Sequence, residues 1–187
     1  RGAVVIAAAG NSAGRSAGSP ANCPGVIGVA GLRHAGSKVG FSDLGPEISI
    51  AAPGGNCVNI GDNEPCLYPI LTTADSGTRA PATSIYSDSF NASVGTSFAS
   101  PLVAGTAALL HSVKADITPA QVRAVLQASA RPFVASGLPD DPFSGPVTTC
   151  QAPGAFDQLQ CYCTTSTCGA GMLDADGAVR ALFGAGA

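Results

Sequence analysis

Three short apolar runs stand out in the first third of the chain. They cover residues 4–9, 26–30 and 48–51, and polar or glycine-rich stretches separate them. A strand that is buried on both faces of a sheet carries such a continuous run, whereas a strand with one face in water alternates apolar and polar residues. The pattern therefore predicts three buried strands of a parallel sheet.

The spacing of the apolar residues changes to three and four positions in the second half of the chain. This spacing predicts a helix over residues 97–113. A second helix is predicted over residues 118–130, because Thr118 is a favourable N-cap and Pro119 suits the first helical position. A last helix is predicted over residues 173–183.

Strands in the first part and helices in the second, without an internal repeat or a linker, indicate an α/β fold. We expect a three-layer α/β/α sandwich with a mainly parallel sheet. In such folds the functional side chains gather at the carboxyl ends of the strands. Asn11 follows the first predicted strand and Ser97 begins the first predicted helix, so both side chains can reach that edge.

Composition narrows the class of protein. Hydrophobic residues make up 45% of the 187 residues, which is enough for a substantial core, while 24 glycines and 14 prolines predict many turns. The nine basic residues form no cluster and the formal net charge is −3. The sequence therefore indicates no basic patch that would bind nucleic acid or an anionic membrane. The sequence contains no signal peptide and no apolar run of membrane-spanning length. We expect any signal and propeptide to lie upstream.

Seven cysteines indicate disulfide bonds and an oxidising compartment, because they lack the spacing and the histidine partners of a zinc site. Cys57 and Cys66 enclose eight residues and are expected to staple a surface loop. Four further cysteines share a second loop and can form two bridges, whose connectivity stays open: Cys150, Cys161, Cys163 and Cys168. Cys23 is left over, and we expect its partner to lie outside this chain.

The segment 91–105 contains a candidate nucleophile. Ser97 lies between a tight-turn glycine, Gly95, and the start of an apolar helix. The positive end of a helix favours negative charge, so an oxyanion that forms beside Ser97 would be stabilised. The tripeptide Gly-Thr-Ser alone is weak support, since serine is a common residue at the start of any helix.

The full string Asn-Ala-Ser-Val-Gly-Thr-Ser-Phe-Ala-Ser-Pro-Leu-Val-Ala-Gly resembles the serine motif of the subtilisin-like serine peptidases, the subtilases of peptidase family S8. A second family motif lies upstream in the family order, over residues 4–11. Three segments between the two motifs also resemble subtilases, so that the resemblance covers nearly the whole chain: residues 19–30, 41–45 and 50–55. It implies a secreted serine endopeptidase in which Ser97 is the nucleophile and Asn11 donates its side-chain amide to the oxyanion.

The resemblance also implies that part of the Ser-His-Asp triad lies outside this chain. In subtilases the aspartate and the histidine both precede the asparagine motif, and only ten residues precede Asn11 here. His111 lies 14 residues beyond Ser97 on the same predicted helix, which is about 21 Å at about 1.5 Å per residue. His34 falls in a polar turn and is expected to be solvated. We therefore expect residues 1–187 to be the C-terminal part of a single catalytic domain, inactive alone, with both groups supplied by an upstream segment or a second chain.

The resemblance further indicates where a protein or peptide substrate binds. Six residues resemble the family's primary specificity pocket, three in one wall and three in its base: Ala8, Ala9 and Gly10, then Gly18, Ser19 and Pro20. The opposite wall would belong to the N-terminal half, which Cys23 can join by a disulfide.

Residues at about 55–91 are interpreted as a disulfide-stapled insertion and those at about 150–168 as a cysteine-rich loop. The chemistry needs no cofactor, and the resemblance allows a structural calcium ion for which no ligands can be assigned.

Two other classes of protein stay open at this point. A catalytically inactive subtilase-like fragment or binding module would use the same scaffold, although intact Ser97 and Asn11 argue against it. An α/β-hydrolase would need its acid and its histidine after the serine, and only His111 follows Ser97, on the same predicted helix. The α/β-hydrolase class is therefore nearly excluded.

Overall fold

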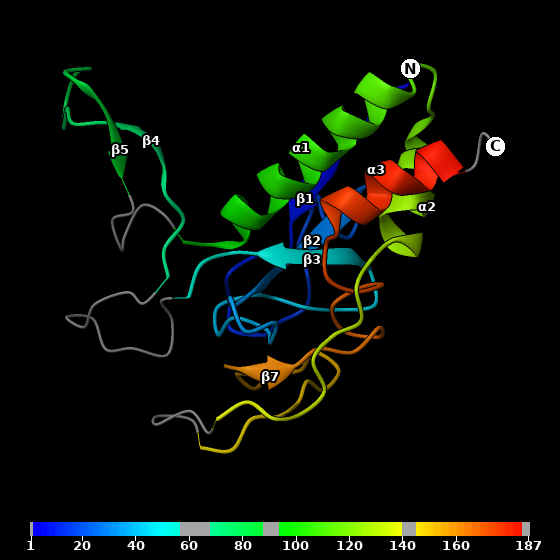
Figure 1. Cartoon of the computed structure of the whole chain (residues 1–187). Coiled ribbons are helices and arrows are strands. Elements are labelled where there is room, and N and C mark those ends of the chain that lie inside the picture. The colour runs from blue at the N-terminus through cyan, green and yellow to red at the C-terminus, as the bar shows by residue number, and fades with distance from the viewer. Residues whose placement is uncertain (1, 57–67, 88–93, 140–144, 185–187) are drawn as a thin grey trace.

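The computed structural model describes residues 2–56, 68–87, 94–139 and 145–184 (Figure 1). The helices and strands within these residues are, in chain order, β1 (Ile6–Ala8), β2 (Ile27–Leu32), β3 (Ile48–Pro53), β4 (Thr72–Asp75), β5 (Ser84–Ser87), α1 (Thr96–Val113), α2 (Pro119–Ala128), β6 (Thr148–Thr149), β7 (Cys161–Tyr162) and α3 (Ala175–Gly184).

The central sheet contains β1, β2 and β3 in this order, and both pairs are parallel. Ile6 of β1 lies opposite Ile27 of β2, and Val29 of β2 lies opposite Ile50 of β3. Every residue of β2 is buried, and so is all of β3 except its last residue. The three apolar runs are therefore parallel strands, as the sequence predicts, although β1 is shorter than the run over residues 4–9.

Helices α1, α2 and α3 cover one face of this sheet (Figure 1). Helix α1 packs against all three strands, α2 packs against β3, and α3 packs against α1 and α2. The side chains that join the two layers form one apolar core, which includes Ile27, Val29, Ile50, Val103, Leu110 and Leu126. In the described part of the chain, no helix combines the length and the apolar character needed to cross a bilayer.

The opposite face of the sheet packs against irregular chain. Ala30 and Leu32 of β2 and Ala51 of β3 form a second core with Leu44 and with four buried cysteines. None of the described helices contributes to this second core. The α/β class with a parallel sheet is confirmed, and the described residues place the helical layer on one face and disulfide-bonded loops on the other.

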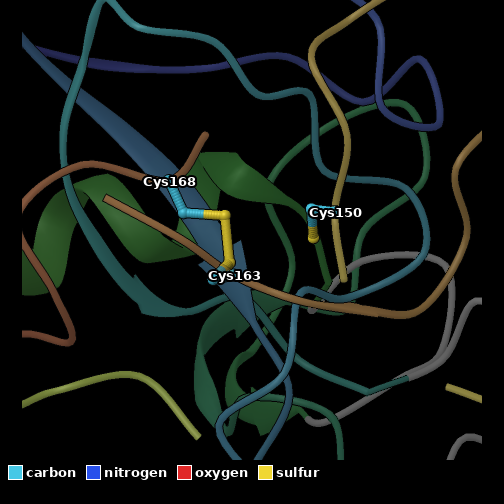
Figure 2. Close-up of side chains that lie close together, drawn as sticks. All are labelled: Cys150, Cys163 and Cys168. Carbon is cyan, nitrogen blue, oxygen red and sulfur yellow. A yellow bond between two sulfur atoms is a disulfide. The ribbon is translucent and has the colours of Figure 1, made fainter. Parts of the chain in front are cut away.

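Two disulfides hold the cysteine-rich loop together. They join Cys150 to Cys161 and Cys163 to Cys168. The sulfur atoms of Cys150, Cys163 and Cys168 all lie within 4.8 Å of one another (Figure 2), so the two bridges are neighbours within the second core. The structure thus pairs the four C-terminal cysteines among themselves and settles the connectivity that stays open in the sequence.

A small antiparallel hairpin extends away from the sheet and the helices (Figure 1). It consists of β4 and β5, with Thr72 opposite Ser87 and Asp75 opposite Ser84. Sequence analysis interprets this region as an insertion loop and predicts no strand, because both strands are short and largely polar. The predicted staple between Cys57 and Cys66 lies outside the described residues.

Candidate active site

Ser97 is the second residue of α1, and its side chain is exposed at the N-terminal end of the helix. The N-cap is Gly95, whose backbone has φ 138° and ψ 160°, a conformation that favours glycine. Glycine has no side chain that could cap the helix. Asn11 Oδ1 instead accepts the backbone N–H of Thr96 at 3.0 Å. The start of α1 is therefore tied directly to the loop after β1.

Gly95 lies next to the side chain of Asn11 and to the backbone nitrogen of Ser97. A Cβ atom at Gly95 would lie 3.4 Å from Asn11 Nδ2 and 3.7 Å from the backbone nitrogen of Ser97. Asn11 Oδ1 lies 3.9 Å from the same position, so the Asn11 side-chain amide and the backbone N–H of Ser97 lie close together at the start of the helix. Donors at the positive end of a helix can stabilise negative charge on a carbonyl oxygen beside Ser97.

Thr96 is a residue of this arrangement that sequence analysis does not single out. Its side chain is fully buried, and Oγ1 lies 2.9 Å from Asn11 Oδ1 and 3.2 Å from the carbonyl oxygen of Gly10. Asn11 Oδ1 thus accepts from both the backbone and the hydroxyl of Thr96. The amide nitrogen is the part of the Asn11 side chain that is left for a ligand. The only signal in the sequence is a hydroxyl residue between the glycine and the serine.

A buried carboxylate holds the loop that follows β1. Asp43 Oδ1 accepts the backbone N–H of Ser12 at 2.9 Å and that of Arg15 at 3.0 Å. The backbone N–H of Asp43 donates to the carbonyl oxygen of Gly10 at 2.9 Å. Burial raises the pKa of the Asp43 carboxyl, while the hydrogen bonds from Ser12 and Arg15 and the charge of Lys38 act against that rise. Sequence analysis misses Asp43 because its partners lie 28 and 31 positions away.

Lys38 is fully buried next to this segment and supports it. Its Nζ donates to three backbone carbonyls, those of Val39 at 3.1 Å, Gly40 at 3.0 Å and Ser42 at 2.9 Å. An ammonium group has three donors, so each of them has an acceptor. Burial lowers the pKa of Lys38 to about 7, and the nearby charge of Asp43 acts in the opposite direction.

The two histidines of the chain, His34 and His111, lie in other parts of the fold than Ser97. His111 lies near the C-terminal end of α1, 14 residues after Ser97, which is about 21 Å along the helix. His34 is exposed in a turn, as predicted, with its Nδ1 3.3 Å from Asn56 Nδ2 and its ring centroid 4.0 Å from that of Tyr68. Partial desolvation of the ring by its neighbours lowers the pKa of His34, and the charge of Arg33 acts in the same direction.

The six residues predicted for the specificity pocket lie in two adjacent segments. One segment starts at the last residue of β1 and the other precedes β2: Ala8, Ala9 and Gly10, and Gly18, Ser19 and Pro20. A hydrogen bond of 3.2 Å from the N–H of Gly18 to the carbonyl oxygen of Ala9 joins the two segments. Cys23 follows the second segment, with an exposed free thiol whose Sγ lies 3.8 Å from Ser19 Oγ.

The three sulfur atoms of Figure 2 are the one group of His, Cys, Asp or Glu side chains, within the described ranges, that is compact enough to surround a metal ion. All three belong to disulfides. Calcium takes oxygen ligands, so this group does not fit the structural calcium ion that the resemblance allows.

Known proteins resemble this chain in sequence. The model of the subtilase family, Peptidase_S8, matches residues 1–186. An extracellular protease of Xanthomonas campestris is 37% identical over 185 residues, which make up 98% of this chain and 24% of the relative. Subtilisin of Bacillus pumilus is 36% identical over 133 residues, or 69% of this chain and 40% of that protein. The chain thus spans less than half the length of both relatives.

Solved structures resemble it in fold. A protease from Pseudoalteromonas arctica matches with a TM-score of 0.70 and 35% identity, over 96% of this chain and 43% of that structure. The prenylagaramide maturation protease PagA matches with a TM-score of 0.60 and 26% identity, over 96% of this chain and 50% of that structure. The family match over nearly the whole chain, the relatives above 30% identity and the shared fold agree. The chain belongs to the subtilase family of serine peptidases.

Proposed function

We propose that this chain provides the nucleophile and the oxyanion hole of a secreted serine endopeptidase. Ser97 Oγ attacks the carbonyl carbon of a peptide bond, and its proton passes to a histidine base. The carbonyl oxygen becomes an oxyanion that accepts from the backbone N–H of Ser97 and from Asn11 Nδ2. The observation that carries the proposal is the contact of Asn11 Oδ1 with Thr96, which places the Asn11 side chain at the start of α1 beside Ser97.

The remaining steps follow from the same groups. When the tetrahedral intermediate collapses, the C–N bond breaks and the histidine gives its proton to the leaving amine. A water molecule, deprotonated by the same histidine, then hydrolyses the ester on Ser97 and releases the second product. The histidine passes the first proton from Ser97 Oγ to the leaving amine and the second from the water back to Ser97 Oγ. The chemistry we propose therefore uses no cofactor.

We propose that the histidine and its orienting aspartate come from outside this chain. His111 lies at the far end of α1 and His34 lies in a turn against Tyr68, so neither is placed as the base. Residues 1–187 would form the C-terminal part of a single catalytic domain that contains the insertion and the cysteine-rich loop. An upstream segment or a second chain would supply the N-terminal half. The 43% coverage of the Pseudoalteromonas protease structure supports this division.

We propose proteins or peptides as substrates, bound beside the two pocket segments. The hydrogen bond between Gly18 and Ala9 holds these segments together, and their small side chains leave room for apolar substrate side chains of varied size. Secretion is supported by the relative named as an extracellular protease and by the two disulfides, which persist in oxidising compartments.

The first prediction tests the division of the triad. We expect the purified chain alone to leave casein uncleaved, because Ser97 then has no base to take its proton. Activity should appear when the chain is joined to an upstream subtilase segment that carries the aspartate and the histidine. This joined protein is called the assembled domain below. Release of acid-soluble peptides from casein measures both samples.

The matched control is the same pair of proteins with Ser97→Ala. Cleavage by the isolated chain that disappears with Ser97→Ala would show that a base lies within residues 1–187, and the proposed division would be wrong. An assembled domain that folds and binds peptide without cleaving it would instead favour an inactive binding module.

The second prediction concerns Cys23, whose exposed thiol lies beside the pocket segment of Ser19. We expect a disulfide between Cys23 and a cysteine in the N-terminal half, because the other described cysteines are already paired. Closing a loop of tens of residues would stabilise the domain by about 2–4 kcal/mol. Non-reducing peptide mapping of the complete secreted protein measures the pairing. A free Cys23 thiol, or a bridge to any other cysteine of this chain, contradicts the prediction.

A further inference from the structure

The loop over residues 10–15, called the Asn11 loop below, has a backbone that needs external support. Gly10, Ala13 and Gly14 all have positive φ, at 118°, 59° and 87°. A non-glycine residue such as Ala13 adopts this region at a free-energy cost, so the surrounding contacts must hold the loop in its shape. The side chain of Asn11 is itself exposed, and burial therefore contributes little to its placement.

Asp43 binds the backbone on both sides of Asn11. On one side, the backbone N–H of Asp43 donates to the carbonyl oxygen of Gly10 at 2.9 Å. On the other side, the N–H of Ser12 donates to Asp43 Oδ1 at 2.9 Å, and the N–H of Arg15 donates to the same oxygen at 3.0 Å. One buried residue thus fixes the peptide groups before and after Asn11 and also the end of the loop.

The second carboxylate oxygen of Asp43 fills the space beside Gly10. A Cβ atom at Gly10 would collide with Asp43 Oδ2. Asp43 is 3% exposed as a residue, and Lys38 lies close enough for its charge to act on the carboxylate. The position of Asp43 is therefore determined by packing as well as by hydrogen bonds, which a support for a precise loop requires.

The side chain of Asn11 is oriented from the opposite direction. Thr96 donates its backbone N–H and its hydroxyl to Asn11 Oδ1, at 3.0 and 2.9 Å. Asp43 therefore holds the Asn11 backbone and Thr96 holds the amide oxygen, while Nδ2 lies next to Gly95, 3.4 Å from where a Cβ atom would be. A shift of the backbone would move Nδ2 even if the contact with Thr96 survived.

We propose that Asp43 is a positioning residue for the oxyanion donor Asn11, which it places through hydrogen bonds to the backbone of the Asn11 loop. The inference rests on the proposed role of Asn11 in peptide hydrolysis. Asp43 acts only through Asn11, so its removal has a measurable effect on turnover only while the Asn11 amide is present.

The test is a double-mutant cycle in the assembled domain, with Asp43→Ala and Asn11→Ala alone and combined. A displaced catalytic group costs up to about 10²-fold in rate, so we expect Asp43→Ala to lower kcat by about 10- to 100-fold with little change in KM. In the Asn11→Ala background the same change should lower kcat by less than about 2-fold, because two groups that act as one unit are not additive.

Two further variants keep the test sharp. Asp43→Asn retains an oxygen that can accept from Ser12 and Arg15, so we expect its kcat to stay within about 3-fold of the unchanged domain. Asp157→Ala removes an exposed aspartate that pairs with the side chain of Arg15 at 2.6 Å, and it should leave kcat unchanged. Thermal unfolding and circular dichroism establish that each variant is folded. If Asp43→Ala does not fold, a cycle of Asp43→Ser with Asn11→Ala takes its place, and Asp43→Asn stays the conservative control.

Equal losses of kcat from the Asp43 change in both backgrounds overturn the proposal, because the effect would then not pass through Asn11. A folded Asp43→Ala variant with unchanged kcat overturns it as well, and so does an Asp43→Asn variant that loses as much as Asp43→Ala. Failure of the proposed function is a different result, in which Asn11→Ala alone leaves kcat unchanged.

Discussion

Replacing Ser97 with alanine is expected to abolish turnover of peptide substrates by the assembled domain. In the proposed mechanism the hydroxyl oxygen of Ser97 forms the bond to the substrate, and Ser97 is exposed at the N-terminal end of α1. In subtilisin, a relative, loss of the nucleophile lowers kcat by about 10⁶-fold, and that magnitude belongs to the relative. Initial rates on a chromogenic peptide measure the loss.

Ser100→Ala is the matched control for this experiment. Ser100 lies one turn further along α1 and donates its hydroxyl to the carbonyl oxygen of Thr96 at 3.2 Å. Loss of the Ser100 hydroxyl should leave kcat within about 3-fold of that of the unchanged assembled domain. A single side-chain hydrogen bond contributes only about 1 kcal/mol to the free energy of unfolding, so the helix should keep its place. A Ser97→Ala variant that turns over at a comparable rate would show that the nucleophile has been assigned to the wrong residue.

Replacing Asn11 with alanine is expected to lower kcat by about 10²- to 10³-fold while KM changes little. The reason is that, in the proposed mechanism, the Asn11 amide binds charge that is present in the transition state and absent in the bound substrate. Steady-state kinetics of the assembled domain on one peptide separate the two constants. The size of the effect is that of the same group in subtilisin and is carried over from that relative.

Asn11→Asp gives the sharper comparison. Aspartate has the same shape and can still accept from Thr96 through one oxygen, but it has no N–H to donate to the oxyanion. We expect a loss of kcat at least as large as that of Asn11→Ala, because a negative charge would also repel the oxyanion. An unchanged kcat in either variant shows that Asn11 takes no part in stabilising the transition state.

Much of the fold follows from the order of apolar residues. The runs at 26–30 and 48–51 correspond to β2 and β3, because continuous apolar segments of that length suit a sheet covered on both faces. The helix signals at Thr118 and Pro119 are equally local, and α2 begins where they indicate. The hairpin of β4 and β5 carries no comparable signal, since its strands are four residues long and mostly exposed.

The candidate site is predictable only in part. Ser97 and Asn11 stand in short motifs whose spacing resembles a known family, so both can be proposed without a structure. Thr96 and Asp43 become visible only through contacts that span 85 and 31 positions. The residues next to Thr96 and Asp43 in the sequence do not indicate such contacts. A buried aspartate that accepts two backbone N–H groups and an aspartate exposed in a turn can have the same local sequence.

The place of β1 in the sheet has a consequence for assembly. Its one strand neighbour among the described residues is β2, so the outer backbone groups of β1 have no strand partner there. An unpaired, apolar edge is a template for strand addition. An N-terminal half that adds a strand at this edge must do so in one alignment, since a slip by a single residue turns every side chain to the opposite face. The same edge would offer its backbone groups to a second copy of the chain as well, so an added N-terminal strand and a second copy would bind at one place.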